Sequence, residues 1–393
     1  MTTTQDRQNS PDARPGHDAH DAHDALGALD ALDVIVIGAG QAGLATAHHL
    51  ARHGLRFLVV DAAPTIGHAW RSRWDSLRLF TPAQYDGLPG LAFPAPAGTY
   101  PTKDEVADYL ETYATTFELP VLLECAVTRL EHSDGLFALH TTRGRLLAHR
   151  VVVATGPFQT PVRPAVSAEL PGSVTQLHSA SYRSPADVAP GPVLVVGAGN
   201  SGRQIALELA GSHGAAGHGA AGHEVTLAVG TESLQLPQRV LRRDLFWWLT
   251  RLGVITKTTD SLLARRMRAR GDLVIGTPLR DLRRAGVRIR PRLTGTVPGG
   301  VRFADGAVGR PATVVWATGF RRDYSWIDIP GVVDDGVVTH TRGLSDVPGL
   351  AFVGLPWQHT RGSALLGFVG DDAGWVADRL AVQTPGRVRP TSG

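Results

Sequence analysis

The sequence predicts an α/β protein built from two dinucleotide-binding, Rossmann-like domains. Two glycine-rich strings carry this prediction, GAGQAG at residues 38–43 and GAGNSG at residues 197–202. Each string follows an apolar run, VIVI or VLVV, and each precedes an alanine- and leucine-rich stretch that is typical of a helix. One such string is a weak signal in a chain with 45 glycines, whereas two copies in the same strand–loop–helix context predict two nucleotide sites.

Size and composition are those of a globular protein with more than one domain. The chain has 393 residues, of which 43% are hydrophobic and 19% charged, which is enough for two or three hydrophobic cores. A formal net charge of only +3 gives no reason to expect a nucleic-acid partner. No apolar run approaches the roughly 20 residues of a membrane span, and no secretory signal is visible. We therefore expect a cytoplasmic protein without a membrane span.

The first strand–loop–helix unit contains everything that a nucleotide site needs. Gly38 permits the tight turn, Gly40 lets the backbone approach a pyrophosphate, and Gly43 allows the helix to pack closely on the strand. The helix N-terminus supplies N–H donors for phosphate oxygens. The next strand, LRFLVVDA, ends on Asp61, close to the roughly 20-residue spacing expected for an acid that binds ribose.

The remainder of the first half is predicted to contain loops, one helix and short strands. Residues 1–31 are predicted to be a disordered tail that is rich in Asp, His, Ala and Pro. Residues 70–100 read as long loops, and residues 103–117 as an amphipathic helix. Residues 121–153 read as short β segments that lead into VVVATG.

The second unit repeats the first loop but not its acid. Its glycines are Gly197, Gly199 and Gly202, and the following strand, EVTLAV, ends on Gly230 and Thr231. Without a carboxylate a 2′-phosphate is not repelled, so NADP is expected and NAD stays open. The arginines that we expect to pair with that phosphate are Arg203, Arg239, Arg242 and Arg243.

Two strands ending in Ala-Thr-Gly, VVVATG and VVWATG, flank this second unit and suggest that the second domain is inserted into the first. The predicted FAD domain comprises residues 32–157 and 313–385, and the predicted NAD(P) domain residues 158–312, with a tail at 386–393. Residues 231–285 read as basic and helical, and Phe246, Trp247 and Trp248 are interpreted either as core or as a wall of a substrate channel.

Several chemistries have no support in the sequence. Cys125 is the single cysteine, so the dithiol flavoprotein reductases are excluded and a buried structural thiol is expected. No HExxH, GxSxG or zinc-ligand spacing occurs, so neither a hydrolytic mechanism nor a metal site is predicted.

These motifs resemble those of the flavin-containing monooxygenases, the class B flavoprotein monooxygenases that use FAD and NADPH. The resemblance covers residues 33–385 and rests on GAGQAG, GAGNSG, ATGF at 317–320 and the string HSASY. In that string, His178 and Tyr182 match the family's histidine and aromatic residue between the two loops. The strings WRSRWDSLRLFTPAQYDGLPG and LPQRVLRRDLFWWL look closest to a bacterial branch similar to the auxin-forming, indole-pyruvate-type monooxygenases.

The resemblance implies FAD at the first loop and NADP at the second. The tail segment 357–366 would approach the flavin ring, where Trp70, Thr81 and Gln358 are the candidates for residues that act in catalysis. The predicted cofactor-binding residues are Gly38, Gly40, Gln41, Ala42, Gly43, Asp61, Trp70, Thr155, Gly156, His178, Gly197, Gly199, Asn200, Ser201, Gly202, Arg203, Thr318, Gly319 and Leu365.

Two positions depart from the family pattern. Many members that oxidise amines and sulfides have an asparagine in the region corresponding to residues 77–81, and this chain has none there. Many members have an arginine near the position of Thr231, and it is absent here.

The implied reaction is a monooxygenation that uses oxygen and a small organic substrate. NADPH reduces FAD, oxygen adds to give a C4a-(hydro)peroxyflavin, and this species oxygenates the substrate in a closed, water-poor site. Two alternatives remain open: a flavin-dependent NAD(P)H reductase or oxidase that inserts no oxygen, and a redox- or nucleotide-sensing regulatory flavoprotein. The sequence predicts neither the substrate nor the oligomeric state.

Overall fold

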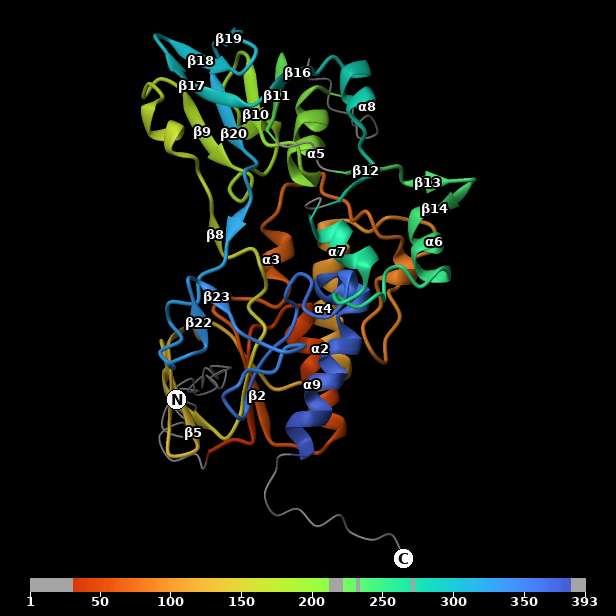
Figure 1. Ribbon diagram of the computed structural model, residues 1–393, viewed down its shortest axis with the longest axis vertical. Coiled ribbons are helices and arrows are strands. Elements are labelled where there is room, and N and C mark those ends of the chain that lie inside the picture. The colour runs from red at the N-terminus through yellow and green to blue at the C-terminus, as the bar shows by residue number, and fades with distance from the viewer. Residues whose placement is uncertain (1–30, 212–221, 231–233, 270–272, 383–393) are drawn as a thin grey trace, which may run out of the picture.

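Two parallel five-stranded sheets lie one above the other along the long axis of the molecule (Figure 1). The computed structural model describes residues 31–211, 222–230, 234–269 and 273–382. The expectations for both tails, for most of the low-complexity loop after residue 211 and for Thr231 lie outside these residues. No helix of the described ranges is long and apolar enough to cross a bilayer.

The lower sheet contains the first glycine loop. Its strands are fully parallel, and its central strand is apolar along its whole length because helices or loops cover both faces. In spatial order the strands are β24 (Leu350–Phe352), β7 (Val151–Val153), β1 (Val34–Ile37), β2 (Phe57–Val60) and β3 (Val121–Leu122).

The upper sheet contains the second glycine loop and is also fully parallel. Its central strand is again flanked by the strand after the glycine-loop helix and by a strand ending in Ala-Thr-Gly. In spatial order the strands are β16 (Arg288–Pro291), β11 (Val225–Val229), β10 (Val193–Val196), β20 (Thr313–Trp316) and β9 (Thr175–His178).

The two sheets are copies of one pattern. In each, a three-stranded antiparallel meander precedes the Ala-Thr-Gly strand, and a helix precedes the edge strand β3 or β16. The meanders are β4 (Val127–Ser133), β5 (Leu136–Thr141) and β6 (Gly144–Ala148), and β17 (Leu293–Val297), β18 (Gly300–Phe303) and β19 (Val308–Gly309). The copies differ in their fifth strand: β24 comes from the end of the described chain, whereas β9 comes just before β10.

The predicted return to the FAD domain at residue 313 is wrong for β20. This strand pairs in parallel with β10 and β9, so it belongs to the upper sheet. The second domain is inserted into the first, because β24 returns to the lower sheet after the upper sheet is complete. The two Ala-Thr-Gly strands do not mark the ends of this insertion, because each belongs to the sheet of its own copy. We therefore propose the domain boundary after Gly319.

The two copies are joined by a narrow two-stranded ribbon. β8 (Thr160–Pro161) leads up to the second copy, and β21 (Phe320–Arg321) leads back beside it in antiparallel pairing (Figure 1). Each strand of this ribbon follows an Ala-Thr-Gly turn, β8 after residues 154–156 and β21 after residues 317–319.

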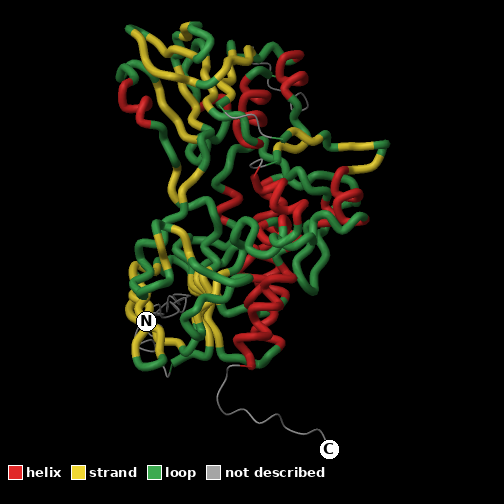
Figure 2. Tube along the Cα trace, in the orientation of Figure 1, coloured by secondary structure: helices red, strands yellow, loops and turns green. Residues whose placement is uncertain are grey.

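Helices cover the faces of the sheets, and short helices form a layer between them (Figure 2). The helix predicted at residues 103–117 and the helices expected after both glycine strings are confirmed. The helices are α2 (Gln41–Arg52), α3 (His68–Arg71), α4 (Lys103–Thr116), α5 (Asn200–Leu209), α6 (Leu245–Arg251), α7 (Leu262–Ala269), α8 (Leu279–Arg284) and α9 (Gly370–Val382).

The region between α5 and α8 also contains short strands. A hairpin of β13 (Arg239–Val240) and β14 (Arg243–Asp244) projects from the side of the molecule (Figure 1). The other pair in this region is β12 (Gln235–Leu236) with β15 (Val274–Ile275). After β21 the chain forms a further short hairpin, β22 (Val333–Asp334) with β23 (Val337–Val338).

Separate hydrophobic clusters support the two copies. α2, α4 and α9 pack on one face of the lower sheet, and the other face holds a second cluster that includes Cys125, which is 1% exposed. The expected buried structural thiol is therefore confirmed. Trp70 packs against the clusters of both copies and so lies where they meet.

Candidate functional site

The first glycine loop leaves open space at one glycine only. Gly38 has φ +110°, and a Cβ on Gly43 would lie 1.7 Å from the carbonyl oxygen of Gly38. A Cβ on Gly40 would meet no atom within 4 Å. The turn and the helix contact therefore exclude side chains, and the middle glycine faces a space that a pyrophosphate can approach.

The N-terminus of α2 is free to bind an anion. Gly40 is its N-cap residue, and no side chain caps the helix. The first backbone N–H groups of a helix have no partners within the helix, and the helix dipole favours negative charge there. The loop therefore fits a dinucleotide phosphate.

Asp61 lies beside this loop and contacts its backbone. One carboxylate oxygen accepts a hydrogen bond from Ala39 N at 2.6 Å, and the other accepts one from Ala63 N at 2.8 Å. An ionised carboxylate accepts more than one hydrogen bond per oxygen, so capacity for a ribose hydroxyl remains.

The second glycine loop repeats this geometry. Gly197 has φ +109°, a Cβ on Gly202 would lie 1.9 Å from the carbonyl oxygen of Gly197, and Gly199 faces open space. By strand register Val229, the last residue of β11, occupies the position that Asp61 holds in the first copy. The observed strand thus lacks the acid, as predicted from its sequence.

Asn200 and Arg203, both predicted cofactor ligands, instead bond to the chain's own backbone. The Asn200 amide donates to Leu273 O at 3.0 Å and accepts from Ile275 N at 3.1 Å. Arg203 is 1% exposed, and its guanidinium donates to Ala198 O at 2.8 Å and to Thr277 O at 2.9 Å. The expected direct pairing of Arg203 with a 2′-phosphate is therefore wrong in this structure, because its donors face inward.

The other predicted phosphate partners lie on the projecting hairpin. Arg239, Arg242 and Arg243 are exposed, and the Arg243 guanidinium stacks over the Trp247 ring at 5.0 Å. Among the described residues, none of the four predicted arginines is therefore seen to contact a ligand position at the second loop.

Ala42 and Ser201 occupy equivalent places in the first turns of α2 and α5. Ala42 is buried, and a Cβ on Gly354 would lie 2.7 Å from its methyl group. Gly354 follows β24, so the end of the returning strand also borders the first loop. The sequence analysis missed Gly354, although its place after the apolar run LAFV was a usable signal.

Both Ala-Thr-Gly turns form hydrogen bonds with the chain segment that leads from the first copy to the second. Gln159 donates to the Thr155 hydroxyl at 2.8 Å and to Gly156 O at 2.9 Å. The Thr318 hydroxyl donates to Val162 O. These predicted residues therefore lie together, at the junction between the copies.

His178 lies at the same junction, beside Gly319. Its Nε2 is 3.1 Å from Gly319 O, and its ring packs edge-on against Phe320. The imidazole is 2% exposed, and burial lowers its pKa below the usual range. Tyr182, the second residue of the family string, is buried and donates to Glu208 at 2.7 Å. Both residues brace the second sheet.

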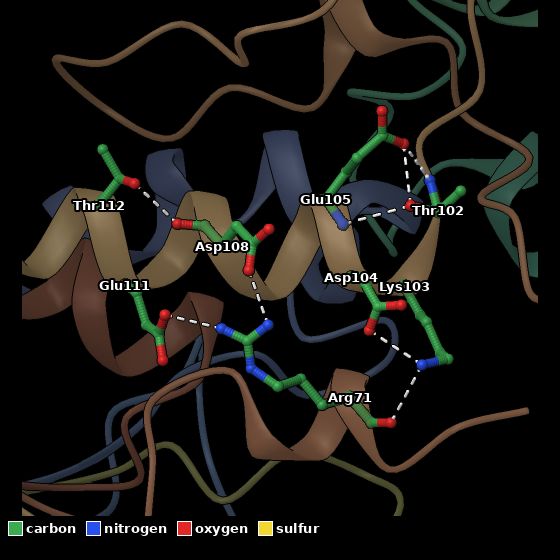
Figure 3. Close-up of polar contacts among 8 residues, drawn as sticks. All are labelled: Arg71, Thr102, Lys103, Asp104, Glu105, Asp108, Glu111 and Thr112. Carbon is green, nitrogen blue, oxygen red and sulfur yellow. Dashed lines mark hydrogen bonds and ion pairs between the residues drawn. The ribbon is translucent and has the colours of Figure 1, made fainter. Parts of the chain in front are cut away.

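Trp70 is held near the first loop by the short helix α3. Its Nε1 lies 3.4 Å from the Gln41 amide oxygen, at the start of α2. Arg71 fastens α3 to α4 through Asp108 and Glu111, each at 2.6 Å (Figure 3). A capping box begins α4: Thr102 and Glu105 satisfy each other's backbone N–H groups (Figure 3).

Thr81 is paired with a buried acid. Its hydroxyl donates to one oxygen of Asp86 at 2.5 Å, and the second Asp86 oxygen has no hydrogen-bond partner among the described residues. Asp86 is completely buried, and this burial raises its pKa to about 7. Sequence analysis missed Asp86, whose signal is a lone acid within the apolar stretch LFTPAQYDGLPG.

Gln358 is buried, and its amide is engaged at both ends. It accepts from Leu355 N at 3.2 Å and donates to Arg342 O at 3.4 Å. We therefore propose that Gln358 supports its segment rather than acting on a substrate. Leu365, the other candidate from this segment, packs against an apolar cluster.

This apolar cluster closes the space between the copies. Its centre is Phe246, and Phe80 and Leu365 pack against it from the lower copy. The free volume inside is only about 10 Å³. Phe246 is thus core, whereas Trp247 and Trp248 are half-buried beside it.

A wide pocket of about 420 Å³, open to solvent, lies at the surface beside Asp86, whose chain neighbours Tyr85 and Gly87 line it. Tyr85 and Phe368 line it and also pack near the Phe246 ring. Its remaining lining residues are Gln84, Gly87, Leu88, Gly90, Leu91, Ala92 and Gly367.

No group of three or more His, Cys, Asp or Glu side chains in the described parts of the chain is arranged to hold a metal ion.

Comparisons with known proteins agree with this architecture. Residues 35–239 match the family described as pyridine nucleotide-disulphide oxidoreductase. An uncharacterized CzcO-like oxidoreductase of Geobacillus kaustophilus is 43% identical over 348 residues, 88% of this chain and 97% of that protein. The indole-3-pyruvate monooxygenase YUCCA8 of Oryza sativa subsp. indica is 30% identical over 394 residues, with 91% of each chain covered.

A solved structure resembles the whole described fold. The flavin-containing monooxygenase from Stenotrophomonas maltophilia has a TM-score of 0.74 and 30% sequence identity. The match covers 90% of this chain and 99% of that one.

Proposed function

Because the chain belongs to the flavin monooxygenase family, we propose that it binds FAD at the first glycine loop and NADP(H) at the second. The proposed reaction transfers one atom of dioxygen to a small organic substrate and reduces the other to water. Two electrons come from NADPH. As a member of this family the protein is an enzyme.

The observation that carries this proposal is the duplicated loop. In both copies the outer glycines pack against backbone, the middle glycine faces open space, and the following helix has no side-chain cap. Two such loops fit two dinucleotides, one on each sheet.

FAD, when bound, supplies the hydride acceptance and the oxygen chemistry, which no side chain here provides. The residues of this chain bind and orient. Asp61 is placed to accept from a ribose hydroxyl, and Trp70 to border the start of the first helix through its contact with Gln41.

Exclusion of water is the second task of the chain. The Phe246 cluster packs Phe80 and Leu365 into a space with little free volume, and both side chains belong to segments that we assign to the flavin side. A dry site strengthens electrostatic interactions and limits side reactions.

Among the described residues, Asp86 of the Thr81–Asp86 pair is the acid whose pKa burial raises to about 7. Its neutral form keeps a proton on a carboxyl oxygen in a buried place. We propose that Asp86 holds this proton while Thr81 fixes the orientation of the carboxyl group.

We propose that the open pocket beside Asp86 admits a small organic substrate. Its volume of about 420 Å³ falls within the range of ligand sites, and Tyr85 and Phe368 provide aromatic walls. For the nicotinamide nucleotide, the absence of an acid at Val229 favours NADP over NAD.

Rapid mixing tests the proposed function. The FAD-loaded protein is reduced without oxygen by NADPH or NADH and then mixed with oxygenated buffer. A flavin absorbance that is neither reduced nor oxidised and persists for seconds, with little hydrogen peroxide released, is the expected result.

Two outcomes contradict this proposal in different ways. Immediate return to the oxidised spectrum, with one hydrogen peroxide released per NADPH, indicates an oxidase. Absence of reduction by either nucleotide, despite bound FAD, indicates a nucleotide or redox sensor.

A further inference from the structure

A buried positive charge lies directly behind the second glycine loop. Arg203 is 1% exposed and is among the largest fully buried side chains of the described residues. Arginine is almost never fully buried unless a partner of opposite charge accompanies it. Its environment therefore needs a specific explanation.

Arg203 has polar partners but no counter-charge. Its Nε donates to Ala198 O and its Nη1 to Thr277 O, and both acceptors are neutral backbone carbonyls. Burial lowers the pKa of Arg203, and within the described residues no carboxylate forms an ion pair with it. Among the described residues, the structure thus shows no charge that balances this cation.

The first glycine loop shows what this position normally requires. The residue after the last glycine is Leu44 in the first copy and Arg203 in the second. Leu44 is 0% exposed and packs in an apolar core. An apolar side chain therefore satisfies the fold at this place, and the charge of Arg203 is additional to what the packing needs.

The contacts of Arg203 connect this charge to the loop itself. Ala198 is the second residue of the GAGNSG string, between the glycine of the tight turn and the glycine that faces open space. The N-terminus of α5 begins two residues later. The guanidinium is therefore close to the place where a ligand phosphate would meet the backbone N–H groups.

We infer that Arg203 is a positioning residue of the second dinucleotide site, whose buried charge strengthens binding of the pyrophosphate common to NADP and NAD. This inference rests on the proposed binding of a nicotinamide dinucleotide at this loop. Arg203 acts from behind the backbone and makes no contact with the 2′-phosphate. It therefore raises the affinity for both nucleotides by a similar factor.

The physical basis is the low polarizability of the surroundings. Opposite charges separated by several ångströms attract weakly in water but considerably more strongly at the effective dielectric constant of a protein interior. The ligand's pyrophosphate supplies the missing counter-charge. Its binding also relieves part of the unfavourable energy of the buried cation.

The direct test compares Arg203→Met with the wild-type protein, both full-length and loaded with FAD. Dissociation constants for NADP⁺ and for NAD⁺ are measured by calorimetry at low and physiological salt. The expected result is an increase of about tenfold in both constants, because one buried charge is removed in each complex. The ratio of the two constants stays unchanged.

Thermal unfolding gives a second readout that a merely structural role would not produce. Methionine fills a similar volume without charge, so the variant without dinucleotide unfolds at the wild-type temperature or above it. The rise in melting temperature caused by saturating NADP⁺ becomes smaller than in the wild type.

Two variants serve as controls. Arg203→Lys keeps the charge and is expected to retain most of the affinity, although it loses the fork geometry. Leu44→Met, at the same position of the first copy, is expected to leave dinucleotide affinity unchanged. If Arg203→Met does not fold, Arg203→Gln provides the neutral comparison.

Each remaining outcome overturns the inference. Unchanged dissociation constants for both nucleotides mean that Arg203 only supports the fold. A loss confined to NADP⁺ means that it reads the 2′-phosphate directly. A wild-type protein that binds FAD but neither nucleotide refutes the proposed function itself, which separates that failure from the failure of this inference.

Discussion

The two glycine loops have the same backbone and opposite electrostatics. In the first, Asp61 lies beside the loop and accepts from Ala39 N, while Leu44 lies behind it. In the second, Val229 takes the place of the acid, and Arg203 behind the loop donates to Ala198 O. One loop therefore has an anion that binds its N–H group, and the other has a cation that binds its C=O group.

This difference separates two kinds of information in a nucleotide-binding fold. Glycines decide whether a phosphate can approach, and they are the same in both copies. The charges decide what the ligand meets on arrival, and they differ. The first copy also contains a buried acid, Asp86, which is a second charge that differs between the copies.

The largest expected effect tests whether the copies are independent. Gly43→Ala and Gly202→Ala each place a Cβ less than 2 Å from a backbone oxygen, so each is expected to destabilise its copy by about 4 kcal/mol or more. Gly43→Ala should abolish the yellow colour of the purified protein. Gly202→Ala should retain FAD and lose dinucleotide binding.

The matched controls for this pair are Gly40→Ala and Gly199→Ala. Their Cβ atoms meet no protein atom within 4 Å, so the proteins should fold normally and lose only ligand affinity. If Gly202→Ala loses FAD as completely as Gly43→Ala does, the copies form one cooperative unit and the comparison fails.

The next effect concerns the buried acid. Because burial raises the pKa of Asp86 to about 7, the folded protein keeps a proton that the unfolded chain releases near pH 4. The stability linked to that proton is complete below the unfolded pKa and is lost as pH rises through 7. We expect a loss of about 3 kcal/mol between pH 5 and pH 8.

Urea unfolding at pH 5 and pH 8 measures this loss. Asp86→Asn should remove most of it, so that the variant is more stable than the wild type at pH 8. Thr81→Val removes the hydrogen bond that lowers the pKa of Asp86, and it should keep the pH dependence. An Asp86→Asn variant with wild-type pH dependence would disprove the assignment.

Changing the charge at each of the two equivalent rim positions should change ligand affinities by about tenfold, or about 1.4 kcal/mol. Asp61→Asn removes the ionised acceptor beside the first loop and should weaken FAD binding. Val229→Asp introduces an acid beside the second loop and should weaken NADP⁺ binding more than NAD⁺ binding. Equilibrium titrations of the apoprotein with FAD, and of the holoprotein with each nucleotide, give the constants.

An equal loss of NADP⁺ and NAD⁺ in Val229→Asp would contradict this reasoning. It would mean that the new side chain disturbs the strand rather than the 2′-phosphate.

The smallest effect concerns the ion pairs by which Arg71 holds α3, the helix that carries Trp70, against α4. Arg71→Met breaks two partly exposed ion pairs with α4, and its expected cost is about 1 kcal/mol, together with faster loss of FAD. Dilution followed by flavin fluorescence measures the release. Arg288→Met breaks an exposed pair in the second copy and should leave FAD release unchanged.

Sequence patterns were sufficient for the features that depend on a few consecutive residues. Both loops, their strands and the start of α2 follow from glycine spacing and from apolar runs, as the geometry of Gly38 and Gly197 confirms. The missing acid of the second copy was visible for the same reason.

Features that depend on distant segments could not be predicted in this way. The two Ala-Thr-Gly strands are alike in sequence, and only the pairing of β20 with β10 assigns it to the upper sheet. Arg203 was predicted to bind a phosphate because it follows the glycine loop in sequence. Its contacts with Ala198 O and Thr277 O depend on how α5 packs, and the sequence pattern does not show this packing. The raised pKa of Asp86 arises from burial by several segments, which no local pattern records.

The different origins of the fifth strands give the copies different histories during synthesis. Every strand of the upper sheet lies between residues 175 and 316, so that copy is complete in sequence before the ribosome reaches residue 350. The lower sheet has to wait for β24, with the edge of β7 open to other strands until then. The nascent chain therefore completes the strands of its second sheet before those of its first, and a premature stop before β24 removes a strand from the lower sheet only.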